Sequence, residues 1–266
     1  MSCMITVQHV ITLMEQLAPH SYAESWDNVG LLAGSKEREV KNIVVCLDLS
    51  EKLIEKAISL KADLIVSHHP LIFSPIKNVT DETSVGKRLV SLIKNDISYI
   101  ALHTNYDIAA GCMSDLVAKR IGLRGEPLEK TASMEDEDVG RGKVGDLEKS
   151  LKISEIAELV KERFKLPHLR VFDGGEDRLI SRIAISPGSG KGMYKVAYEK
   201  RASLLISGDI SHHDAVDALE LGVATIDAGH YGLEHIFIAD MAQRLRDMDK
   251  AFNIFEEDIT FPDRIA

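Results

Sequence analysis

Residues 62–70 read ADLIVSHHP, and residues 202–209 read ASLLISGD. Each stretch is a short apolar run that ends in serine, and a His-His pair follows each within a few residues. An apolar run without polar alternation is typical of a strand that is buried on both faces of a parallel sheet. The recurrence of the run predicts that the chain contains two similar halves.

Strand-like runs alternate with helical patterns on either side of these two stretches. The predicted strands are 42–48, 63–67 and 97–102 in the first half, and 179–185, 203–207 and 223–227 in the second. The predicted helices are 5–17, 51–60, 84–94, 114–121, 153–164, 191–200, 214–221 and 233–246, with Ser50 as the N-cap of the second. This alternation predicts mostly parallel sheets with right-handed crossovers.

The predicted fold is therefore α/β, with two similar lobes that contain mostly parallel sheets and are related by an internal repeat. We expect a first lobe over residues 1–125 and a second over residues 179–266. Residues 126–178 are expected to form a short connecting region that holds no large inserted domain. An acidic run at 135–138 is interpreted as part of a solvated loop.

Composition excludes several classes of protein. The 266 residues carry a formal net charge of −10, which argues against bulk binding of nucleic acid. Three widely spaced cysteines give no disulfide framework and favour a reducing compartment. No signal peptide is recognisable at residues 1–5, and no apolar stretch approaches the roughly 20 residues that span a bilayer. A cytoplasmic protein with no membrane partner is predicted.

The strand ends carry the residues that point to chemistry. His68 and His69 directly follow the apolar run at 63–67. Adjacent side chains on an extended chain point to opposite sides, so the two histidines would reach two metal ions, or both ions from a turned loop. In open α/β sheets, ligands bind beyond the carboxyl ends of the strands, which is where these residues lie.

Two histidine–carboxylate motifs follow later strands. His103 lies four residues before Asp107, and His230 lies four residues before Glu234. On a helix this spacing places both side chains on one face. Imidazole and carboxylate ligands without cysteine suit Zn, Fe, Mn, Co or Ni. Two such ions about 3.5–4 Å apart lower the pKa of a shared water and generate a nucleophile for hydrolysis. Because the motifs recur in both halves, the metal site is predicted to lie between the two lobes.

Further residues are expected near this site. Asp227 precedes His230 closely and is predicted to orient it. His213, in the pair that corresponds to His68 and His69, is predicted to line the site without binding metal. Gly188 and Gly190 follow a strand and open a helix, an arrangement that resembles an anion cradle, although the loop lacks the first glycine and the Ser/Thr of a Walker A motif. A tight turn is the alternative.

Together these motifs resemble the GTP cyclohydrolase 1 type 2 homologue family, also described as NGG-interacting-factor-like or DUF34. The resemblance covers nearly the whole chain. It is carried by residues 24–31 (ESWDNVGL), 67–73 (SHHPLIF), 103–107 (HTNYD), 207–209 (SGD) and 227–231 (DAGHY), with Glu234.

The resemblance implies two divalent metal ions per chain. The implied ligands are His68, His69, Asp107, His230 and Glu234, with Glu234 as a bridge and His103 beside the site. It also implies a ring-shaped homohexamer, built as a trimer of dimers. Two functions follow as hypotheses: a metal-dependent hydrolase that acts on GTP, another phosphoester or an amide, and a non-enzymatic metal carrier or regulatory partner of protein or DNA.

Overall fold

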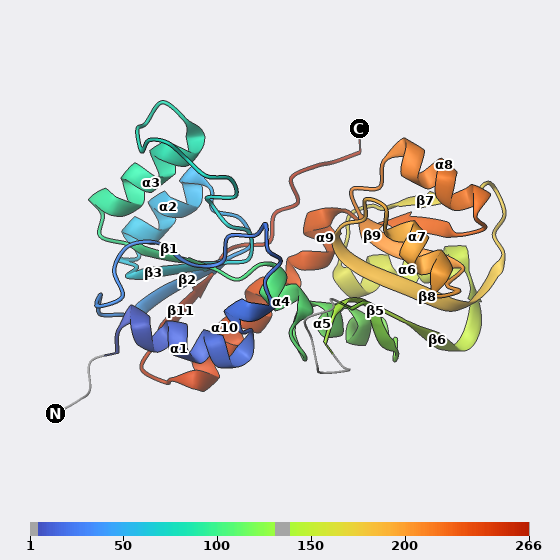
Figure 1. The fold of residues 1–266 in the computed structure, drawn as a ribbon, viewed down its shortest axis with the longest axis horizontal. Coiled ribbons are helices and arrows are strands. Elements are labelled where there is room, and N and C mark those ends of the chain that lie inside the picture. Colours follow the sequence, from blue (N-terminus) through green and yellow to red (C-terminus); the bar gives the residue numbers. More distant parts are fainter. Residues whose placement is uncertain (1–4, 131–138, 266) are drawn as a thin grey trace. The chain divides into compact units, whose positions relative to one another are not determined.

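The computed structural model describes residues 5–130 and 139–265 (Figure 1). The chain divides into two compact units. Unit 1 comprises Met1–Tyr106 and Phe237–Ile259, and unit 2 comprises Asp107–Ile236 and Thr260–Ala266. This division differs from the predicted lobes, because unit 2 already begins at Asp107 and the chain returns to unit 1 near its end.

Unit 1 is built on a five-stranded sheet in the order β1-β4-β3-β2-β11. Strands β4, β3, β2 and β11 run parallel to one another, and the edge strand β1 runs antiparallel to β4. The apolar runs that predicted parallel strands form its centre. The bounds are β1 Gly30–Ala33, β2 Asn42–Cys46, β3 Leu64–Ser67, β4 Ser98–Ala101 and β11 Asn253–Glu256.

Helices cover both faces of this sheet. Helices α2 and α3 lie on one side, and α1 and α10 lie on the other (Figure 1). Leu53 of α2 and Leu89 of α3 pack in one core cluster with Val44 and Tyr99 of the sheet. The Ser50 hydroxyl accepts the Leu53 N–H at 3.1 Å, which confirms the predicted N-cap. The bounds are α1 Val7–Leu17, η1 His20–Tyr22, α2 Glu51–Ser59, α3 Ser84–Lys94, α4 Thr104–Ile108 and α10 Ile236–Met248.

Unit 2 is built on a six-stranded mixed sheet in the order β5-β6-β8-β9-β10-β7. Its core strands β8, β9 and β10 are parallel, and the remaining pairs are antiparallel. The bounds are β5 Glu126–Glu129, β6 Arg141–Lys152, β7 Arg170–Phe172, β8 Leu179–Ser189, β9 Leu204–Gly208 and β10 Ala224–Asp227.

The helices of unit 2 pack on this sheet. Met193 and Ala197 of α7 and Ala215 of α8 share a core cluster with Leu205 of β9. Because Leu204 and Ile206 alternate with Leu205 and are also buried, the opposite face is covered as well. The bounds are α5 Met113–Arg120, α6 Ile153–Phe164, α7 Met193–Glu199, α8 His212–Glu220 and α9 His230–Glu234.

The expected connecting region at 126–178 is instead part of unit 2. It supplies β5, β6 and β7 of the sheet and the amphipathic helix α6. Five apolar side chains of α6 are buried, which accounts for its helical periodicity. The acidic run at 135–138 lies outside the described residues.

The predicted α/β class is confirmed, and both units contain the same β-α-β-α-β-α order. The sheet register aligns them. Ser67 pairs with Ala101 in unit 1, and Ser207 pairs with Asp227 in unit 2. Ala101 and Asp227 therefore occupy equivalent positions. Thr104 is the third residue after Ala101 and His230 is the third after Asp227, so His230 corresponds to Thr104. The two histidine–carboxylate motifs are therefore offset by one residue.

Two strands of unit 1 are absent from the predicted elements. Strand β1 lies between the predicted helix at 5–17 and the predicted strand at 42–48, where no element was predicted, and β11 extends the sheet beside β2. Both are only four residues long, too short for a clear periodic signal. Across residues 5–130 and 139–265, no helix combines the length and apolar character that a membrane span requires.

Candidate metal centre

Three histidines of unit 1 lie together at the carboxyl edge of its sheet. Strand β3 ends at Ser67, and the chain bends through His68 and His69. One ligand atom each from His68, His69 and His103 lies within 4.8 Å of the others. Of the two predicted arrangements, an extended chain or a turned loop, the structure supports the turned loop, because the bend brings the adjacent imidazoles of His68 and His69 to the same side. We call these three residues the histidine triad.

Every imidazole of the triad is held through its Nδ1 atom by an acceptor. For His68 that acceptor is a backbone carbonyl, so Nδ1 must carry the hydrogen and the lone pair lies on Nε2. Ionised carboxylates impose the same tautomer on the other two rings. The acceptors are Leu102 O at 2.7 Å for His68, Asp48 Oδ1 at 2.8 Å for His69 and Asp27 Oδ1 at 2.8 Å for His103.

Unit 2 holds a histidine–carboxylate pair on one short helix. His230 and Glu234 are the first and last residues of α9, and His230 Nε2 lies 3.0 Å from Glu234 Oε2. Two ligands that each lie about 2.0–2.2 Å from one ion are roughly 3 Å apart when they bind at a right angle. Asp209 Oδ2 accepts the Nδ1–H of His230 at 2.8 Å. His230 is therefore anchored through Nδ1, as the rings of the triad are.

Gly188 makes the position of Glu234 possible. Its φ is +73°, and a Cβ built there would lie 2.6 Å from Glu234 Oε1. Gly190 N–H donates to Gly208 O at 2.7 Å, so this amide completes a backbone turn. The expected anion cradle is therefore a turn in which the glycines let β8 approach Glu234 and β9 closely.

Asp107, the remaining predicted ligand, is a buried residue of unit 2 within α4. Its backbone carbonyl accepts the Ser114 hydroxyl at 2.6 Å, which ties α4 to α5. This contact fixes the backbone from which the Asp107 carboxylate projects.

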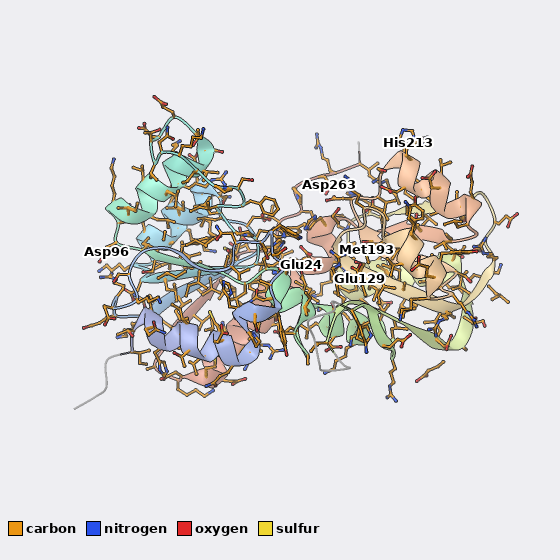
Figure 2. The ribbon with its side chains drawn as sticks, in the orientation of Figure 1. Glu24, Asp96, Glu129, Met193, His213 and Asp263 are labelled. Carbon is orange, nitrogen blue, oxygen red and sulfur yellow. The ribbon has the colours of Figure 1, made fainter. Side chains whose placement is uncertain are left out.

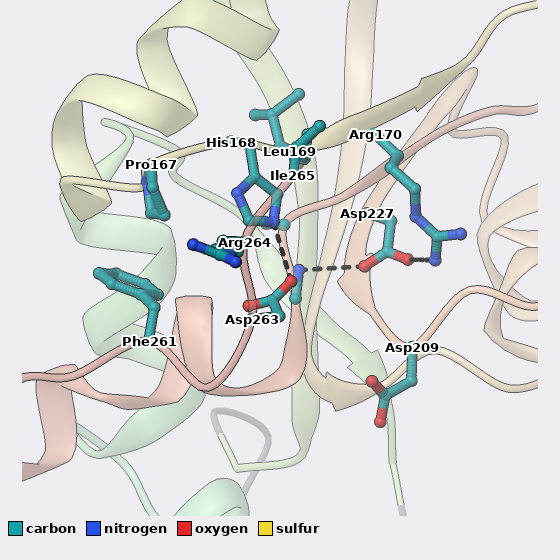
Figure 3. A pocket seen from close by; sticks show the side chains of 12 residues that line it. Pro167, His168, Leu169, Arg170, Asp209, Asp227, Phe261, Asp263, Arg264 and Ile265 are labelled. Carbon is teal, nitrogen blue, oxygen red and sulfur yellow. Dashed lines mark hydrogen bonds and ion pairs between the residues drawn. The ribbon is translucent and has the colours of Figure 1, made fainter.

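The predicted role of Asp227 belongs to another residue. Asp227 accepts the N–H groups of Ile210 at 3.1 Å and Gly229 at 3.0 Å and forms an ion pair with Arg170 (Figure 3). These contacts shape the turn before His230, but the carboxylate that holds the His230 ring is Asp209. Asp209 directly follows β9, as Asp48 closely follows β2, so a strand-end position was the signal that could have identified both.

His213 lies away from the pair. It is exposed in the first turn of α8 and projects outward at the end of that helix (Figure 2). Its ring neighbour is His212, at a centroid distance of 5.4 Å. In the sheet register, Gly208 and Asp209 occupy the positions of His68 and His69, so the two His-His pairs are not structural counterparts.

A pocket of about 280 Å³ opens in unit 2 beside the strand ends that carry Asp209 and Asp227. The C-terminal segment lines one side of it, where His168 Nε2 lies 2.8 Å from Asp263 Oδ2 (Figure 3). Gly229, the residue before His230, also lines it. A ligand in this pocket would lie next to the backbone that carries the pair.

Asp27 is the most perturbed carboxyl group of the triad's surroundings. Burial alone would raise its pKa, but hydrogen bonds from His103 and Thr104 hold the pKa well below its usual range. The charged form is thus the one that the fold stabilises. A carboxylate that stays ionised keeps the hydrogen of His103 on Nδ1.

The lowered pKa of Asp27 predicts a pH dependence of stability. Its contribution is complete above the unfolded pKa of about 3.9 and is lost as the pH falls toward the lower folded value. In protein stripped of metal, Asp27→Asn should unfold at a lower temperature than wild type near neutral pH and lose less stability on acidification. Thermal unfolding at a series of pH values measures both. Identical pH dependences in the two proteins would contradict the assignment.

Asp209 provides a test of how the pair is positioned. Asn tolerates the left-handed φ of +52° at this position, so Asp209→Asn should keep the backbone while weakening the hold on His230. Loss of such a supporting carboxylate typically lowers metal affinity about 10- to 100-fold. Metal titration followed by competition with a chelator measures the change, with Glu220→Gln, an exposed site on α8, as the control. Equal affinities in the two variants would rule out the role.

Comparison with known proteins gives a family. The family model Duf34/NIF3 (NGG1p interacting factor 3) matches residues 5–262. The chain is 33% identical over 252 residues to the GTP cyclohydrolase 1 type 2 homolog of Clostridium perfringens, covering 93% of this chain and 95% of the relative. It therefore belongs to the Duf34/NIF3 family.

Solved structures agree with this membership. The Staphylococcus aureus hypothetical protein SA1388 matches with a TM-score of 0.88 and 28% identity, covering 99% of this chain and 100% of that one. Reduced HcgD from Methanocaldococcus jannaschii matches with a TM-score of 0.82 and 30% identity, covering 97% and 99%. The chain thus has the fold of this family along nearly its whole length, and it contains histidine and carboxylate groups that could bind metal ions.

Proposed function

We propose that the protein binds two divalent metal ions and uses them for hydrolysis. The observation that carries this proposal is the repeated anchoring of Nδ1 in His68, His69, His103 and His230. Packing alone gives no reason for four imidazoles to be anchored through the same ring nitrogen. Metal binding does, because each ring then presents the Nε2 lone pair and the second atom fixes its orientation.

The proposed ligands are those predicted from the sequence. They are His68, His69, Asp107, His230 and Glu234, with His103 added because it joins the triad. The donor set is imidazole and carboxylate, which fits Zn, Fe, Mn, Co or Ni. When bound, such ions supply Lewis-acid activation of water and of the electrophile. Asp27, Asp48 and Asp209 orient the imidazoles through Nδ1, raise their basicity as ligands and balance part of the added charge.

We further propose that the triad and the pair serve the same two ions, with Glu234 as the bridge. His69→Asn in unit 1 and Glu234→Gln in unit 2 test this together. If the ions share a centre, each single variant should lose most of the bound metal, and the double variant should lose little more. If each single variant instead loses one ion and the double variant loses both, the two ions do not share a centre.

The proposed reaction class is hydrolysis of a small molecule. The name of the Clostridium perfringens relative refers to GTP cyclohydrolase, which makes GTP the first substrate to test. Phosphoester and amide hydrolysis fit the same ligand chemistry. The test is turnover of GTP and a panel of phosphoesters and amides by protein loaded with Mn²⁺, Fe²⁺ or Zn²⁺. Turnover that requires metal and disappears in Glu234→Gln supports the proposal, and no turnover by fully loaded protein would overturn it.

A carrier or partner-binding function is the second candidate. The family description, NGG1p interacting factor 3, refers to an interaction with another protein, which supports this candidate. A carrier would release its ions readily to an acceptor, whereas a catalytic centre would retain them. Transfer of bound metal to a metal-free acceptor protein, without turnover of any substrate in the panel, would favour the carrier.

We also propose that the protein is cytoplasmic and assembles as a homohexamer, arranged as a trimer of dimers. The family resemblance supports the assembly, which predicts a native mass of about six times the 29.4 kDa of one chain. Light scattering during size-exclusion chromatography measures this mass. A monomeric or dimeric mass across a range of protein concentrations would contradict the hexamer.

A further inference from the structure

Two large aromatic side chains of unit 1 are exposed beside the histidine triad. Trp26 is 53% exposed and Phe73 is 55% exposed. Their ring centroids are 5.7 Å apart, with the planes tilted by 51°. The ring of His103 lies 6.1 Å from Trp26 and 6.3 Å from Phe73. We call Trp26 and Phe73 the aromatic platform. Its two rings form one continuous group with the rings of the histidine triad.

The backbone beneath the platform is firmly held. Asn28 Nδ2 donates to Ile72 O at 2.6 Å, which joins the loop that carries Trp26 to the loop that carries Phe73. Asp27 accepts from the backbone N–H of Thr104 at 3.0 Å and from the His103 ring. Each exposed ring therefore lies next to an anchored residue. Such anchoring lowers the entropic cost of holding a ligand against the rings.

Exposure of these rings at this place favours a ligand. Exposed apolar side chains are common singly, but two adjacent aromatic rings in contact with a candidate metal ligand are a specific arrangement. Aromatic faces bind planar heteroaromatic rings by stacking with little dependence on their hydrogen-bonding edges. Two side chains also present far less surface than the roughly 800 Å² per partner of a stable protein interface.

We propose that Trp26 and Phe73 form a stacking platform for a planar heteroaromatic ring, such as a purine base, of a molecule that binds at the triad. This inference rests on the proposed function and names its substrate class. A ligand ring held between Trp26 and Phe73 would require their ring centroids to lie about 7 Å apart, which is twice the usual stacking distance of roughly 3.5 Å. Because the centroids are only 5.7 Å apart, the ligand ring stacks on an outer face.

Tryptophan fluorescence tests the platform directly, because Trp26 is the only tryptophan of the chain. The protein is loaded with Zn²⁺, which does not quench fluorescence, and titrated with GTP and separately with tripolyphosphate. GTP should quench Trp26 saturably, and tripolyphosphate, which has no ring, should not. The same titration of metal-free protein reports whether ring binding depends on the ions.

Variants of Phe73 separate stacking from a structural role. Phe73→Leu removes the aromatic face and should weaken GTP binding roughly 5- to 100-fold, and Phe73→Tyr should restore it. Ile93→Ala, an exposed apolar site on α3, is the matched control and should bind GTP as wild type does. Metal content should be equal in all of these proteins.

Three outcomes would overturn the platform. They are no saturable quenching by GTP, equal quenching by tripolyphosphate, and equal GTP affinity in Phe73→Leu and wild type. A fall in native mass in Trp26→Ala would also overturn it, because the rings would then be an interface between copies of the chain. Saturable quenching by GTP, together with no turnover of any substrate in the panel by metal-loaded protein, would support the platform while contradicting the proposed reaction, so the two failures are distinguishable.

Discussion

Glu234→Gln should leave the protein folded but reduce its bound metal to less than half of the wild-type content. Glutamine keeps the shape of the side chain and removes the negative charge, which a bridging ligand must supply to two cations. Glu234 is only 2% exposed, and glutamine fits the same space and keeps a hydrogen-bonding side chain beside His230 Nε2. The metal-free variant is therefore expected to unfold at a temperature close to that of metal-free wild type.

The matched control is Glu220→Gln, which changes an exposed carboxylate of the same unit. Elemental analysis after dialysis against a weak chelator gives the metal content, and thermal unfolding with and without metal gives the stability. Wild-type protein should be stabilised by metal and Glu234→Gln should not, since ligand binding to the folded state raises its stability. Unchanged metal content in Glu234→Gln would exclude the bridging role.

Gly188→Ala should also disrupt metal binding, although position 188 supplies no ligand side chain. The added Cβ would lie 2.6 Å from Glu234 Oε1 and 3.6 Å from His230 Nε2. Atoms cannot remain at 2.6 Å in that contact, so Glu234 must move or β8 must shift. A misplaced carboxylate is expected to lower metal affinity by about 10- to 100-fold or more, because the loss of a single supporting contact typically has an effect of that size.

Gly192→Ala is the control for this experiment. Its φ is +74°, almost equal to the +73° of Gly188, and a Cβ there would meet nothing within 4 Å. Both variants should therefore carry a similar left-handed backbone penalty of about 1–2 kcal/mol. Only Gly188→Ala should lose metal affinity. If both variants bind metal equally well, the close approach of β8 does not position Glu234.

Much of the fold could be predicted because the central strands are buried on both faces. Runs such as 63–67 and 203–207 contain almost only apolar residues, and this pattern has few structural interpretations. The boundary between the units could not be predicted, because it depends on long-range pairing. Strand β11 joins β2 although about 200 residues separate them in the sequence. Four residues of edge strand carry too little signal to reveal that pairing.

The candidate ligands were predictable because histidines and carboxylates at strand ends are unusual. Their supporting residues were harder to find. Asp48 and Asp209 resemble ordinary loop aspartates until the fold brings them to an imidazole Nδ1 atom. The sequence left both an anion cradle and a tight turn open at Gly188 and Gly190, because glycine also serves close packing. Only the three-dimensional structure distinguishes these two uses.

The number of metal ions per chain tests the account most directly. Protein purified without a metal-binding tag is incubated with Mn²⁺, Fe²⁺ or Zn²⁺, freed of excess ion and measured by elemental analysis. The account predicts close to two ions per chain for at least one of these metals. No bound ion with any of them would contradict the central claim that the anchored histidines and Glu234 form a metal centre.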